Sequence, residues 1–122
     1  MEATLPGADA KSVSILTLGV KDVARSVAFY EALGWEYSPD SDGAFTYVLS
    51  TNIAIGLVPL DFLAREIGLP LEPIPRYNGL LLAINGASPE EVDAIFQRAV
   101  AAGATVQQKP FWKDWDGNPG YS

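Results

Sequence analysis

Acidic and hydroxyl side chains are the first groups in this sequence whose types and spacing could carry chemistry. The segment DWDG, Asp114 to Gly117, places two carboxylates beside tryptophans, and a pair of acids can do acid–base work when burial separates their pKa values. The same segment is typical of a solvated turn, because turns select Asp and Gly for backbone reasons, and we favour the turn. A serine nucleophile is not supported, because neither Ser26 nor Ser88 has a histidine or lysine placed to activate it.

Histidine and cysteine are both absent from the 122 residues. Their absence removes the commonest general base, the commonest metal ligand, and all disulfide and thiolate chemistry. Hydrophobic residues make up 48% of the chain and charged residues 19%, a composition that can bury a core. The sequence therefore predicts one compact domain by size, without imidazole or thiolate chemistry.

Aromatic residues offer a second kind of site, because their rings stack on planar ligands and attract cations over their faces. Tyr47 lies in an alternating strand pattern and Trp112 lies late in the sequence; with Phe45 and Trp115 they could line a cup. Taken singly, each of these residues fits an ordinary core better than a binding site. As a group they predict a pocket with apolar and aromatic walls.

Residues 12–58 carry the pattern of a strand, a helix and three further strands. Residues 12–20 are β-branched and aliphatic, as in a strand. Asp22 is placed to cap a helix with an apolar stripe, and Gly34 is placed to end it. The segment WEYS, the alternating segment AFTYVLS and the apolar segment IAIGLV then complete a βαβββ unit.

The same plan restarts in the second half of the chain. Leu80–Ile84 has the composition of a buried strand. Ser88, Pro89 and Glu91 supply a cap, a first-turn proline and the acid of a capping box for a second helix. Gly103 is placed to end this helix, and ATVQQ resumes as a strand.

These patterns predict a flexible arm at residues 1–11 and a single domain at residues 12–122. The domain consists of a first module (12–58), a connector (59–79) and a second module (80–122). Much of the sequence after the second helix is turn-like. We therefore expect the second module to be truncated, with one strand after its helix and part of another.

The segment LGVKDVARSVAFYEALGWEY resembles the opening of the vicinal oxygen chelate superfamily, which includes glyoxalases, bleomycin-resistance proteins and extradiol dioxygenases. The matching features are a strand followed by Val-x-Asp, the pairs Arg25–Ser26 and Phe29–Tyr30, and Leu33–Gly34–Trp35. SPEEVDAIFQRAVAAGATVQQKP resembles the helix and following strand of the second half. The resemblance implies an α+β fold in which paired βαβββ modules with mixed sheets curl around a cleft, here with the second module incomplete.

Metal-dependent members of the superfamily resembled place one ligand on the first strand and one on the last strand of each half. The corresponding positions fall near Ile15, Ile55 and Leu80, and the fourth would lie beyond Ser122. Neither these residues nor their immediate neighbours are carboxylates or imidazoles, whereas a Zn, Ni or Fe site needs about three such ligands. We therefore expect no metal and no cofactor.

The net charge of −7 disfavours nucleic acid as a partner, because the chain and a phosphate backbone repel each other. The N-terminal residues lack the features of a signal peptide, and no apolar run approaches the ~20 residues that a membrane-spanning helix needs. We expect a cytoplasmic protein without a membrane partner.

The resemblance implies metal-free binding of a small apolar or aromatic molecule, in the manner of bleomycin-resistance sequestration and without catalytic residues. One alternative is a glyoxalase-like lyase or isomerase, and another is a structural remnant that needs a partner chain and binds nothing. A second copy of the chain would complete the unfinished sheet, so a homodimer is expected. The expected cavity lining consists of Ile15, Thr17, Tyr47, Ile55, Leu57, Leu80, Leu82 and Trp112.

Overall fold

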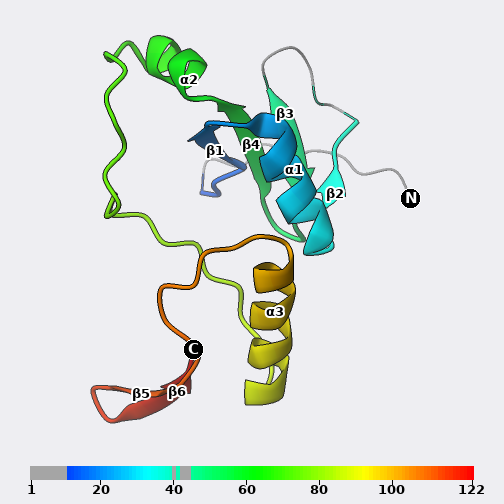
Figure 1. Ribbon diagram of the computed structural model, residues 1–122, viewed down its shortest axis with the longest axis vertical. Helices are drawn as coiled ribbons and strands as arrows, with labels where there is room; N and C mark the ends of the chain where they lie inside the picture. The colour runs from blue at the N-terminus through cyan, green and yellow to red at the C-terminus, as the bar shows by residue number, and fades with distance from the viewer. Residues whose placement is uncertain (1–10, 40, 42–44) are drawn as a thin grey trace. The chain divides into compact units, whose positions relative to one another are not determined.

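The computed structural model describes residues 11–39, 41 and 45–122. The chain divides into two compact units, Met1–Ile74 and Pro75–Ser122, and the boundary lies inside the predicted connector. The predicted arm at residues 1–11 lies outside the described residues, apart from Lys11. In chain order, the elements are β1 (Ile15–Val20), α1 (Val23–Ala32), β2 (Glu36–Tyr37), β3 (Thr46–Leu49), β4 (Ala54–Pro59), α2 (Leu60–Ile67), α3 (Pro89–Ala101), β5 (Trp112–Trp115) and β6 (Asn118–Tyr121) (Figure 1).

The first unit is built on a mixed four-stranded sheet with the order β1-β4-β3-β2. β1 is parallel to β4, whereas β3 is antiparallel to both of its neighbours. The parallel pair is reached through the helix and the two intervening strands, since parallel strands cannot be joined by a tight hairpin. The predicted α+β class and the βαβββ order of the first module are confirmed.

The core of the first unit lies between the sheet and α1, which contacts β2, β3 and β4 and lies across the sheet in Figure 1. Val48, Ile55 and Leu57 are almost completely buried at its centre. Burying a side chain of this size stabilises the fold by roughly 1.5–3 kcal/mol. The partly buried residues packed around this centre are Leu18, Val20, Val23, Val27, Tyr30 and Trp35.

Both ends of α1 follow from local chemistry. The Asp22 carboxylate accepts a hydrogen bond from the Arg25 amide at 3.1 Å, which satisfies one free donor of the first turn. At the other end Gly34 has a φ of 94°, and the Trp35 amide donates to the Tyr30 carbonyl at 3.1 Å. The Tyr30 and Trp35 rings lie 4.9 Å apart, so the turn that ends the helix also adds to the core.

The second unit contains α3 and the β5–β6 hairpin. Neither Leu80–Ile84 nor the segment ATVQQ forms a strand, so these two predictions are wrong for this structure. A strand needs hydrogen bonds to a neighbouring strand, and the described residues supply none for either segment. Leu80–Ile84 is left extensively exposed, with 89% of Leu81 accessible to solvent.

The β5–β6 hairpin replaces the expected strand and part-strand after α3. Its two-residue turn is Asp116–Gly117, with φ values of 53° and 84°. Two successive positive φ values are typical of a type I′ turn, whose twist matches that of the flanking strands. The interpretation of DWDG as a turn is therefore confirmed.

Within the part of the chain that the structure describes, no helix has both the length and the apolar content to cross a bilayer.

Candidate functional site

The side of the first sheet that faces away from the α1 core is the candidate site. The strand registers pair Thr17 with Gly56 and Tyr47 with Gly56, so these three residues share this side. We call it the Tyr47 face. Its positions on β1, β3 and β4 are Ile15, Thr17, Gly19, Tyr47, Leu49, Ala54, Gly56 and Val58.

Gly56 lies at the centre of the Tyr47 face. A Cβ atom at this position would stand 3.2 Å from the Thr17 Oγ1 and 3.3 Å from the Tyr47 Cε1. Both distances are shorter than an ordinary van der Waals contact between such atoms. The missing side chain therefore lets the Thr17 hydroxyl and the Tyr47 ring approach each other over β4.

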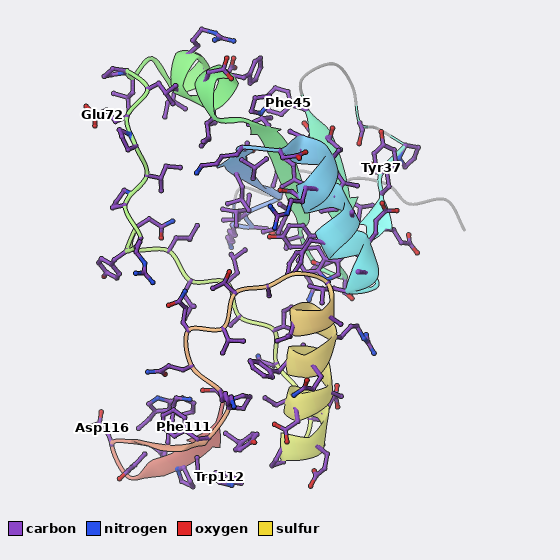
Figure 2. The ribbon with its side chains drawn as sticks, in the orientation of Figure 1. Tyr37, Phe45, Glu72, Phe111, Trp112 and Asp116 are labelled. Carbon is purple, nitrogen blue, oxygen red and sulfur yellow. The ribbon has the colours of Figure 1, made fainter. Side chains whose placement is uncertain are left out.

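The Tyr47 ring belongs to an aromatic group that joins β3 to α2. The Phe45 ring stacks on the Tyr47 ring, with centroids 6.1 Å apart and planes at 14°. The Phe62 ring of α2 meets the Phe45 ring edge-on at 5.3 Å, and Figure 2 shows Phe45 beside this helix. Such pairs hold each other in preferred orientations, so the three rings form one aromatic wall.

The backbone of Tyr47 is held by two serines that follow β2. The Ser41 hydroxyl accepts a hydrogen bond from the Tyr47 amide at 2.9 Å, and the Ser38 amide donates to the Tyr47 carbonyl at 2.9 Å. Ser38 itself is fully buried. These bonds position the tyrosine, and sequence reasoning missed both serines because each acts through the backbone of a residue distant in sequence.

α2 closes one end of the Tyr47 face. A Cβ atom at Gly19 would lie 3.0 Å from a methyl carbon of Leu60 and 3.2 Å from one of Leu63. On the exposed side of α2, the Arg65 guanidinium contacts the Asp61 carboxylate at 3.2 Å. This hydrogen bond holds the pKa of Asp61 below its usual value, and the pair supports a helix of only two turns.

A cavity of about 630 Å³ opens at the Gly19 end of the Tyr47 face. Its walls are the Lys21 and Leu60 side chains and residues 71–74, which follow α2. Gly19 and Thr17 lie two positions apart on β1 and therefore on the same side of the sheet. The volume falls within the ~300–1,000 Å³ range of small-molecule sites.

The structure brings together only part of the predicted cavity lining. Ile15, Thr17 and Tyr47 share the Tyr47 face. Ile55 and Leu57 instead point into the α1 core, where their exposed fractions are 1% and 0%. We correct these two assignments, because alternation along β4 gives the Tyr47 face to Ala54, Gly56 and Val58.

Leu80, Leu82 and Trp112, the other predicted lining residues, belong to the second unit. All three are substantially exposed, with Trp112 at 62%. Their membership of a common cavity with Tyr47 stays a prediction.

The residues of the Tyr47 face do not fit a transition metal. Its positions on β1, β3 and β4 carry no carboxylate or imidazole, and Glu36, which pairs with Leu49 from β2, is the one acid that the registers add. Over residues 11–39, 41 and 45–122, no three His, Cys, Asp or Glu side chains are grouped as metal ligands would be. Because Zn, Ni and Fe sites need about three such donors, no chemistry of this site is derived through a metal.

Comparison with family models assigns most of the chain to one family. The model of the glyoxalase/bleomycin resistance protein/dioxygenase superfamily matches residues 12–118. The search of curated proteins found no match.

Among solved structures, a glyoxalase-related enzyme from Fulvimarina pelagi is 26% identical, with 76% of this chain and 66% of that chain covered and a TM-score of 0.64. A hypothetical protein from S. aureus is 22% identical over 93% of this chain and 84% of that chain, with a TM-score of 0.74. A glyoxalase/bleomycin resistance protein/dioxygenase from Nocardioides is also 22% identical, over 90% and 74% of the two chains, with a TM-score of 0.70. At 22% identity, the last two likenesses speak for the fold alone.

Proposed function

This chain belongs to the glyoxalase/bleomycin resistance protein/dioxygenase superfamily, and we propose that it binds a small, largely apolar or aromatic molecule without a metal. The proposed role is sequestration, of the kind that the bleomycin-resistance members of the family suggest. The proposed site is the Tyr47 face with the adjoining cavity. This superfamily fold hosts several chemistries, so the proposal depends on the residues of the site.

The composition of the Tyr47 face is the observation that carries the proposal. On β1, β3 and β4 it offers an aromatic ring, aliphatic groups and the Thr17 hydroxyl, without a carboxylate, ammonium or imidazole. Apolar walls with a few placed polar groups are typical of small-molecule sites. The stacked rings of Phe45 and Tyr47 suit a planar ligand, which gains contact area at little conformational cost.

The test is a thermal-shift screen of planar aromatic compounds, followed by calorimetry of the compounds that raise the melting temperature. Tyr47→Ala is expected to weaken binding by about 1–3 kcal/mol, because an aromatic anchor supplies much of the contact. Tyr37→Ala is the matched control: it removes another tyrosine of the same unit, which is 51% exposed and pairs with Val48 on the opposite side of the sheet. Equal weakening by the two variants, or a broad library without any shift, would contradict the proposal.

The alternative of a glyoxalase-like lyase or isomerase receives no support from the donor set described above. Elemental analysis of the purified protein separates the two functions. We expect less than stoichiometric Zn, Ni or Fe after mild chelation, whereas about one metal ion retained per chain would favour the enzyme.

A further inference from the structure

The β5–β6 hairpin presents two faces of different chemistry. Residues directly opposite each other in an antiparallel pair share a face. The register pairs Trp112 with Tyr121 and Asp114 with Pro119. We call the side that carries these four residues the Trp112 face. The other side carries Phe111, Lys113 and Trp115 because side chains alternate along a strand.

On the side opposite the Trp112 face, the aromatic rings already contact other groups of the hairpin. The Lys113 ammonium lies 3.9 Å above the centre of the Phe111 ring and donates a hydrogen bond to the Ser122 carbonyl. The Trp115 ring lies against the backbone of Gly120, in the space that a Cβ atom would occupy. This side of the hairpin therefore already contains a cation over an aromatic ring, and the cation comes from the chain itself.

The Trp112 face has the aromatic rings without such a cation. The Trp112 and Tyr121 rings lie 5.4 Å apart with planes at 59°, so they make a corner. Trp112 remains 62% exposed, and Figure 2 labels it on this hairpin. The one cation–π contact found among the described residues is that of Lys113 and Phe111. One face of the indole thus stays available to a ligand.

Negative charge surrounds this aromatic corner. The Tyr121 hydroxyl donates to the Asp93 carboxylate of α3 at 2.8 Å. That hydrogen bond raises the pKa of Tyr121, and partial burial and the charges of Asp93 and Glu90 add to the effect. Asp114 lies two residues from Trp112 on the same strand face. The carboxylates of Asp93 and Asp114 therefore adjoin the corner, which favours a positively charged occupant.

We propose that the Trp112 face binds an alkylated ammonium ion, with the cation over the indole of Trp112 and the carboxylates of Asp93 and Asp114 beside it. The ring quadrupole attracts a cation, and the carboxylates add charge complementarity. A quaternary ammonium group suits this site better than a metal ion, because it has an apolar surface for the indole and demands no set of coordinating oxygens. The site lies in the second unit and is separate from the Tyr47 face, so it goes beyond the function proposed above.

Choline is the probe, and the full chain is titrated with it at constant ionic strength. The indole N–H signals of the three tryptophans are followed by nuclear magnetic resonance. The Trp112 signal is expected to shift with saturation at roughly millimolar choline, since the site is exposed and the ligand small. The uncharged isostere 3,3-dimethylbutan-1-ol should bind with at most a tenth of the affinity of choline. Equal binding of the isostere, or a shift confined to Trp115, would overturn the proposal.

Charge-removing variants provide the matched comparison. Asp93→Asn retains an oxygen that can accept from the Tyr121 hydroxyl. Asp114→Asn likewise retains an oxygen for the Gly117 amide, which donates to the Asp114 carboxylate at 2.7 Å in the native chain. Each is expected to raise the dissociation constant of choline by a factor of about three to ten. Asp116→Asn removes the same charge from the tip of the same hairpin, at a left-handed φ that Asn tolerates.

We expect the Asp116 variant to change the choline affinity less than two-fold, because charges beyond ~8 Å are screened in physiological salt. Trp112→Ala should abolish binding. An Asp116 effect as large as that of Asp114, or no effect from both Asp93→Asn and Asp114→Asn, would show that no ammonium site exists here. This result would leave the Tyr47 proposal unaffected, since its test uses planar aromatic compounds and variants of residues in the other unit.

Discussion

At the scale of single residues, Gly56 shapes the proposed site because it has no Cβ atom. The space over its Cα is occupied by the Thr17 hydroxyl and the Tyr47 ring, at distances that leave little room for a methyl group. Protein interiors are packed closely enough that one extra carbon must displace its neighbours. The identity of this residue therefore sets the position of Tyr47 as much as the tyrosine does.

Gly56→Ala is expected to destabilise the protein by about 1–3 kcal/mol, the usual cost of adding a carbon to a packed site. It should also weaken binding of planar ligands, because the Tyr47 ring must move. Thr17→Ala in the same chain removes one of the two close contacts and should restore part of the lost stability. Urea unfolding of the single and double variants measures this coupling. Additive changes in the free energy of unfolding would contradict a contact between the two sites.

At the scale of elements, the three helices of the described residues end in the same way. Gly34, Gly68 and Gly103 all have a positive φ, between 75° and 111°. In each case the residue after the glycine donates its amide to the carbonyl five residues earlier. A glycine supplies this left-handed turn without a Cβ penalty, which is why local sequence was enough to predict the ends of α1 and α3 at Gly34 and Gly103.

α3 also begins with a reciprocal cap. The Ser88 hydroxyl accepts from the Glu91 amide at 3.1 Å, and the Glu91 carboxylate accepts from the Ala87 amide at 3.1 Å. The first bond satisfies a donor that the first turn of the helix leaves free, and the second ties the residue before the cap to the helix. The predicted Ser88 cap is confirmed, whereas the Glu91 carboxylate accepts from the Ala87 amide and not from the amide of Ser88.

Ser88→Ala is expected to reduce the stability of α3 by about 1 kcal/mol, because one free amide loses its acceptor. Ser88→Asp should retain the stability, since a carboxylate accepts the same bond and favours the helix dipole. Helix content measured by circular dichroism during thermal unfolding distinguishes the variants. Equal unfolding of the Ala and Asp variants would mean that the cap contributes nothing.

At the scale of the whole molecule, the two units differ in how much they bury. All fully buried residues among those described belong to the first unit, and none lies within Pro75–Ser122. Regions with few buried apolar contacts open at low free energy. The stability of the chain is therefore expected to be uneven along the sequence.

Amide hydrogen exchange should reveal this unevenness. Amides of β4, which has a hydrogen-bonded strand on either side, are expected to exchange most slowly. Amides of α3 should exchange at least about ten-fold faster, because this helix has no buried residue. Protection of α3 equal to that of β4 would refute the difference between the units.

The exposed segment Leu80–Ile84 leads to an expectation about assembly. Leu80, Leu81 and Leu82 are 50%, 89% and 45% exposed, and clustered apolar exposure of this kind favours association. We expect a homodimer that covers this segment and buries at least ~1,000 Å² of total surface.

Light scattering through micromolar dilution checks the expectation of a homodimer. Leu81→Lys should shift the protein to monomer, because a charge would have to be buried in the contact. Ile67→Lys is the control, since it places the same charge on an exposed apolar residue at the end of α2. A monomer at all concentrations, or equal effects of the two variants, would contradict the expectation of a homodimer.

The sequence by itself determined the features that depend on neighbours within a few residues. The Asp22 and Ser88 caps, the glycine helix ends and the Asp116–Gly117 turn each rest on hydrogen bonds or φ values inside one short segment. The strand alternation of the first module was equally readable, so Phe45, Tyr47 and Leu49 could be assigned to one side of their own strand. Local chemistry of this kind is the same in any fold.

Only the tertiary structure decided the features that depend on a distant partner. Leu80–Ile84 has strand composition, yet the described residues supply no strand to pair with it. Ile55 and Leu57 are apolar whichever side they face, and the register with β1 and β3 assigned them to the α1 core and Gly56 to the site. Apolar composition favours burial of a strand, but the side that a residue faces follows from pairing, and a shift of one residue reverses it.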